Sequence, residues 1–317
     1  MGTLIGHVAP GFGFFAIGFW HLFNHLKLHL TLSHKYRSLP WFPASFLRHL
    51  ELYLIMLGCV ASVSMELFIG PQRHQPLDTD GTIPSNHLHN FEHSSISLAF
   101  FVFASSALLF DYIGIRPVNE VNEVVQFLAS IAFALQLLLF HFHSADHMGV
   151  EGQYHWLLQL VIFVSLCTTL MGISKPRSFM VGFVRSISIL FQGVWLMTMG
   201  FMLWTPQLIP KGCFMNLEEG HKVVRCHDEE SLERAKSLVN IEFSWFLIGL
   251  GVFTVSFYLV MVKIYGGRDG EGYLKMSLSS SSEEDEEEDV EAQKKEQRTI
   301  SFVTVEKPMP MNYDMER

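Results

Sequence analysis

Long apolar runs separated by short polar stretches make up most of the chain. Seven of these runs approach the roughly 20 residues that a helix needs to cross a bilayer. They cover residues 3–23, 46–69, 91–110, 121–142, 155–173, 179–204 and 241–265. The pattern predicts an all-α polytopic membrane protein with seven transmembrane helices. The longest connection, residues 205–240, is polar and is expected to carry one short helix at 229–239.

Composition supports a membrane protein. Hydrophobic residues make up 49% of the chain and charged residues 17%, against about 25% charged in a soluble globular protein. There are 28 Phe and only 22 Lys and Arg together. These values exclude an ordinary soluble enzyme and argue against a nucleic-acid partner.

The net charge of −9 is concentrated after the last apolar run. Residues 268–317 hold 14 acidic and 7 basic side chains, and serines precede the longest acidic run. Such a segment cannot bury enough apolar surface to fold alone. The sequence therefore predicts two parts, a transmembrane domain at 1–265 and a disordered acidic tail at 266–317 that meets cytosolic proteins.

Basic residues predict the orientation, because Lys and Arg are enriched in cytoplasmic connections. The connections at 24–45 and 174–178 carry several, whereas residues 143–154 carry none. We expect a lumenal or extracellular N-terminus and a cytosolic C-terminus, in the endomembrane system or the plasma membrane. Cys213 and Cys226 then lie on the oxidising side and are expected to form a disulfide. The alternative is two free cysteines in a cytosolic connection.

Several of the 16 histidines fall at the same ends of different apolar runs. Because successive helices alternate in direction, residues from five helices are brought to one level of one leaflet. Imidazole and carboxylate suit a transition metal, above all zinc, and ionisable groups in a bilayer are functional candidates. The predicted metal ligands are Glu66, His93, His141, His143 and His155. Supporting or alternate ligands are His7, Glu92, His147 and Gln192.

Spacing and environment leave alternatives to a metal site. His141 and His143 are two residues apart, so on a regular helix they point in nearly opposite directions. Each polar residue could instead sit at the interface or hydrogen-bond between helices, as we expect for Gln192. A second stripe, formed by His21, His25 and His29, is interpreted as an interfacial surface facing anionic lipid.

Several short strings of residues resemble the transmembrane protein 45 family, also called domain of unknown function 716. The resemblance extends from about residue 1 to residue 265, and the acidic tail suggests a plant-like member. It implies a seven-helix protein of the endomembrane system, often linked to stress or defence, with no established catalytic activity. The residues that carry it are Gly6-His7, Glu66, His93-Ser94, His141-x-His143, His155 and Gln192-Gly193-x-Trp195.

Four functions follow from these features. The first is a binding or scaffold protein in which the cluster holds a structural or regulatory zinc ion. The second is a zinc-dependent intramembrane lipid hydrolase, with Glu66 or Glu92 as proton shuttle. The third is a b-type cytochrome whose haem b is bound by His93 and another histidine, and the fourth is a metal or proton transporter. Membrane lipids and a second copy of the chain are the other expected partners.

Overall fold

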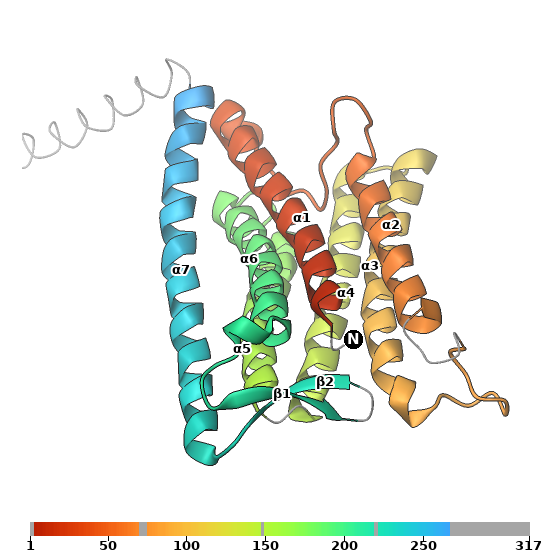
Figure 1. The fold of residues 1–317 in the computed structure, drawn as a ribbon. Coiled ribbons are helices and arrows are strands. Elements are labelled where there is room, and N and C mark those ends of the chain that lie inside the picture. The colour runs from red at the N-terminus through yellow and green to blue at the C-terminus, as the bar shows by residue number, and fades with distance from the viewer. Residues whose placement is uncertain (1–2, 70–74, 147–148, 219–220, 267–317) are drawn as a thin grey trace, which may run out of the picture. The chain divides into compact units, whose positions relative to one another are not determined.

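The computed structural model describes residues 3–69, 75–146, 149–218 and 221–266 (Figure 1). Within these ranges, six helices are long and apolar enough to cross a membrane. They are α2 (Leu50–Ser64, continued to Ile69 by a π-helical turn), α3 (Leu88–Ile113), α4 (Val118–Asp146), α5 (Val150–Ser174), α6 (Phe179–Trp204) and α7 (Glu229–Tyr265). These helices indicate an integral membrane protein. The predicted acidic tail lies outside the described residues.

Helix α1 (Leu4–Thr31) is as long as the others but is not among the six apolar helices of the described ranges. Its second half carries His21, Asn24, His25 and Lys27, which lower its hydropathy. The helix also runs eight residues beyond the predicted end at residue 23. A helix of this composition needs a protein surface that packs against these polar residues.

That surface is supplied mainly by α6, against which α1 packs most extensively. The two backbones approach closely. A Cβ atom built on Gly18 would lie 2.2 Å from the backbone nitrogen of Leu190, and one on Gly193 would lie 2.2 Å from that of Phe15. Small residues permit this kind of approach between membrane helices. Helices α4, α5 and α6 pack in sequence, and α2 packs against α3.

A β-hairpin follows α6, and we use it to name the two ends of the bundle. Strands β1 (Cys213–Glu218) and β2 (His221–Cys226) pair antiparallel, with Cys213 opposite Cys226. A disulfide joins these two cysteines. The hairpin was not predicted, and the helix expected at 229–239 is the first part of α7. We call the end of the bundle that carries the hairpin and the start of α1 the hairpin end (Figure 1). The opposite end, which carries the α1–α2 connection, is called the connection end.

Helix α7 is the least buried of the six apolar helices in the described ranges. It lies at one side of the bundle in Figure 1. Only 6% of its apolar window is buried. Phe243 packs edge-on against Trp195 with ring centroids 4.8 Å apart, while Trp245 and Ile248 are 71% and 66% exposed. Exposed apolar side chains over a whole helix are typical of a surface that lipid covers.

The α1–α6 contact makes a prediction for glycine substitutions. We expect Gly18→Ala to lower the thermal unfolding midpoint by roughly 4–10 °C, because overpacking against a backbone costs about 1–3 kcal/mol. Gly13→Ala is the matched control, since a Cβ atom there meets nothing within 4 Å. Fluorescence-monitored melting of the detergent-solubilised protein measures both. Equal midpoints for the two variants would contradict the close approach.

Candidate functional site

At the hairpin end, a buried carboxylate pairs with a predicted metal ligand. The π-helical turn Met65–Ile69 ends α2 and carries Glu66, which is 2% exposed. The Asn90 side-chain amide donates to Glu66 Oε2 at 2.7 Å, and His93 Nδ1 lies 3.4 Å from Glu66 Oε1. Turns of this type often occur at functional sites. The structure thus brings Glu66 and His93 together from α2 and α3.

A second pair of predicted residues lies at the same end. His7 and His155 are 8% and 1% exposed, and their ring centroids are 5.8 Å apart. His7 also stacks on Trp204 at 4.5 Å. Nδ1 of His7 is 3.1 Å from the Thr3 carbonyl oxygen, and Nδ1 of His155 is 3.0 Å from that of Glu151. A carbonyl only accepts, so Nδ1 donates in both rings, and Nε2 is the basic nitrogen of each neutral ring.

The ring of Phe140 lies between the two pairs. Its centroid is 6.3 Å from that of His93 and 5.6 Å from that of His155. We call Glu66, Asn90, His93, Phe140, His155 and His7 the Glu66 cluster. Among the residues that the structure describes, no three His, Cys, Asp or Glu side chains are grouped so that they could hold one metal ion. The apolar ring of Phe140 separates the two polar pairs.

The remaining predicted ligands have other surroundings. His141 Nδ1 lies 3.2 Å from the Gln159 side-chain oxygen on α5. Gln192 is buried in α6 and donates to Ser165 Oγ at 2.6 Å, so it forms an interhelical hydrogen bond. Glu92 is half-buried on α3. The side chain of His143 and the whole of His147 lie outside the described residues.

The connection end holds a network that the sequence did not predict. Glu51 is 4% exposed at the start of α2. Its carboxylate accepts from Trp20 Nε1 at 3.0 Å and from the backbone N–H of Phe42 at 2.8 Å, and it lies 2.7 Å from His21 Nε2. Three donors from α1 and the α1–α2 connection therefore converge on one buried carboxylate.

An arginine extends this network into α6. Arg185 is 3% exposed, and its Nη2 donates to the Leu39 carbonyl at 2.5 Å and to His25 Nε2 at 3.2 Å. A guanidinium cannot accept, so Nε2 of His25 accepts and Nδ1 donates to Tyr36 OH, 2.9 Å away. Burial raises the pKa of Tyr36, which keeps the phenol neutral. We call Trp20, His21, His25, Tyr36, Glu51 and Arg185 the Glu51 network.

The expectation of a surface histidine stripe was wrong for two of its three residues. His21 is 4% exposed and His25 is fully buried, because α1 continues past residue 23 and the α1–α2 connection covers this face. His29 stacks on Phe179 with centroids 4.0 Å apart. Arg185 is the residue from which a buried network could have been predicted in the sequence, since a lone arginine within an apolar helix requires a buried partner.

Comparison with protein families agrees with the resemblance in the sequence. Residues 122–259 match the family of unknown function DUF716. The predicted resemblance is confirmed over this part of the chain, which runs from α4 through most of α7. The match includes His155, Arg185 and Gln192, whereas Glu51 and Glu66 lie before it. The family description assigns no activity.

The Glu51 network makes a stability prediction. In Glu51→Ala, the donors of Trp20 and His21 and the N–H of Phe42 lose their acceptor. Leaving buried donors unpaired costs about 3 kcal/mol or more, so we expect the melting midpoint to fall by roughly 6–12 °C. Glu120→Ala, at an exposed position of α4, is the matched control and should leave the midpoint unchanged. A Glu51→Ala protein as stable as the control would show that the network contributes nothing to folding.

Proposed function

We propose that this protein is an integral membrane protein of binding or scaffold type that holds a zinc ion at the Glu66 cluster. The observation that carries the proposal is the contact of a buried carboxylate, Glu66, with the imidazole of His93 at the end of the bundle. Ionisable side chains in such a position are costly and are kept where they bind something. Carboxylate and imidazole are the oxygen and nitrogen ligands that zinc takes.

A structural zinc site needs four ligands. Glu66 and His93 supply two from α2 and α3. The candidates for the others are His143 and His147, whose side chains lie outside the described residues, and His7 and His155, which reach the same ion only if the ring of Phe140 moves from between the two pairs. Because Nδ1 of His7 and of His155 donates to a backbone carbonyl, Nε2 is the nitrogen that carries the lone pair in each neutral ring. Such bonds to the second nitrogen orient most metal-binding histidines.

A structural zinc ion is favoured over the hydrolase alternative. A hydrolase would use the same metal and would need Glu66 to carry protons to and from a bound water. Both carboxylate oxygens of Glu66 already face protein groups, Asn90 at 2.7 Å and His93 at 3.4 Å. A carboxylate held on both sides is suited to a fixed ligand and not to a group that carries protons.

The proposal includes seven spans and an orientation. Helix α1 has 28 residues and is about 42 Å long at 1.5 Å per residue, which exceeds a hydrocarbon core of about 30 Å. Its polar residues His21 and His25 are buried against protein, so we assign it as the seventh span. The Cys213–Cys226 disulfide at the hairpin end favours an oxidising compartment on that side. We therefore assign the N-terminus to the lumen or exterior, and the C-terminus to the cytosol.

The test is elemental analysis and an absorption spectrum of the same purified full-length protein. We expect about one zinc ion per chain, lost in His93→Ala and in Glu66→Gln. His34→Ala is the matched control, because His34 is exposed at the other end of α1. A folded wild-type protein without zinc, or full zinc in His93→Ala, would contradict the proposal. A Soret band lost in His93→Ala would replace zinc with haem.

Removing the metal separates the scaffold from the hydrolase. A structural zinc ion stabilises only the folded state, so a chelator should lower the melting midpoint of the wild-type protein. The same chelator should leave the midpoint of His93→Ala unchanged. Chelation that abolishes hydrolysis of a lipid amide or ester without changing the midpoint would favour the enzyme.

A further inference from the structure

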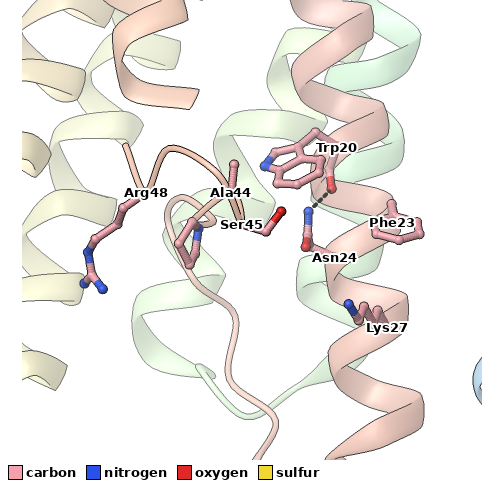
Figure 2. Close-up of a pocket in the computed structure, with 8 residues that line it drawn as sticks. Trp20, Phe23, Asn24, Lys27, Ala44, Ser45 and Arg48 are labelled. Carbon is pink, nitrogen blue, oxygen red and sulfur yellow. Dashed lines mark hydrogen bonds between the residues drawn. The ribbon is translucent and has the colours of Figure 1, made fainter. Parts of the chain in front are cut away.

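A cavity of about 580 Å³ opens beside the Glu51 network, between α1 and the α1–α2 connection. Trp20, Phe23 and Asn24 line it from α1, and Ala44 and Ser45 line it from the connection (Figure 2). Its volume falls within the range of about 300–1,000 Å³ that small-molecule sites occupy. The Glu66 cluster lies at the opposite end of the bundle and takes no part in this cavity.

The two cations in the wall of the cavity are already engaged. Arg48 donates through Nε and Nη2 to Asp111, at 2.9 Å each, and Figure 2 shows its guanidinium turned away from α1. Lys27 likewise has an interaction of its own. The lining residues include no carboxylate. A neutral ligand therefore fits the cavity, since a charged ligand would lose its hydration without gaining a partner.

Two neutral polar side chains face the cavity from its two walls. The Asn24 side-chain amide donates to the Trp20 carbonyl at 2.8 Å, and its Oδ1 remains as an acceptor. Ser45 lines the other wall with a hydroxyl, which Figure 2 shows pointing toward α1. A hydroxyl both donates and accepts. The pair therefore matches a ligand hydroxyl, which can donate to Asn24 and accept from Ser45.

The aromatic wall of the cavity is flat and is fixed before a ligand binds. Trp20 and Phe23 lie nearly parallel, with ring centroids 6.3 Å apart and an interplanar angle of 22°. The Trp20 indole donates to the buried carboxylate of Glu51 at 3.0 Å, which holds the ring in place. A rigid, flat apolar ligand can cover such a wall with little loss of conformational entropy on either side.

The position of the cavity defines what reaches it. Arg48 stands two residues before the span that begins at Leu50, at the level where a bilayer changes from headgroups to hydrocarbon. Between Ser45 and Arg48, Phe46 is 81% exposed and Leu47 is 43% exposed. A ligand that enters past this apolar rim comes from the bilayer and carries its polar group at headgroup level.

We propose that this cavity binds a membrane sterol. The sterol hydroxyl donates to Asn24 Oδ1 and accepts from the Ser45 hydroxyl, while the fused rings lie against Trp20 and Phe23. A phospholipid headgroup would need a free cation. A diacylglycerol is neutral but flexible, so it would lose more conformational entropy on the same wall. A sterol combines one uncharged hydroxyl with a rigid apolar body.

Photolabelling of the full-length protein in membranes, with a sterol that carries a diazirine, tests the proposal. We expect the label on peptides that contain residues 20–24 or 44–48, and excess unlabelled sterol should displace the probe. The 3-epimer of the same sterol is the matched ligand control. Its inverted hydroxyl misses Asn24 and Ser45, so it should displace the probe about fivefold less well, the weight of one neutral hydrogen bond.

Two variants test the polar pair. Asn24→Leu and Ser45→Ala should each weaken sterol binding about fivefold, since each removes one hydrogen bond to the hydroxyl. Ser33→Ala is the matched control, because Ser33 is exposed at the same end and does not line the cavity. Equal melting midpoints of the variants and the wild type establish that they are folded.

Three results would overturn the proposal. They are labelling outside these two segments, unchanged binding in Ser45→Ala, and equal displacement by the two epimers. Displacement of the probe by diacylglycerol as readily as by the sterol would overturn the assignment to a sterol.

Discussion

The backbone contact between α1 and α6 determines where both polar sites lie. Gly18 meets the backbone of Leu190, and Gly193 meets that of Phe15, so neither helix can rotate or slide without a clash. With this register fixed, α1 brings His25 to Arg185 at the connection end. The same register stacks His7 on Trp204 at the hairpin end. One close approach of two helices therefore positions polar groups at both ends of the bundle.

Each site satisfies its buried charges through partners on other helices or connections. Glu51 is bonded by α1 and the α1–α2 connection, and Glu66 by α3. In lipid, the alternative to such a partner is an unsatisfied polar group, which disfavours any other register. The polar residues thus select one register between helices, which apolar packing alone would not specify.

The sequence predicted the features that depend on the length of the apolar runs and on the alternating direction of the helices. The run at 179–204 has the bounds of α6, and alternation of the helices correctly brought Glu66 and His93 to one end. It did not predict features that depend on rotation about a helix axis. Whether Phe140 or His141 faces the cluster, and whether Arg185 meets His25, is set by tertiary packing. The hairpin was missed because its two strands are short and lie in a polar connection.

Cross-linking across the α1–α6 contact tests the account most directly. A Cβ atom on Gly200 would lie 3.0 Å from Val8 Cγ2, a separation compatible with a disulfide. Val8→Cys with Gly200→Cys, in a chain whose Cys59 and Cys167 are replaced by Ala, should lose both new thiols on mild oxidation in membranes. The control pair, Gly13→Cys with Gly200→Cys, should keep both, counted by mass after maleimide labelling under denaturing conditions. Equal oxidation of the two pairs, or none in the first, would contradict the packing on which both sites depend.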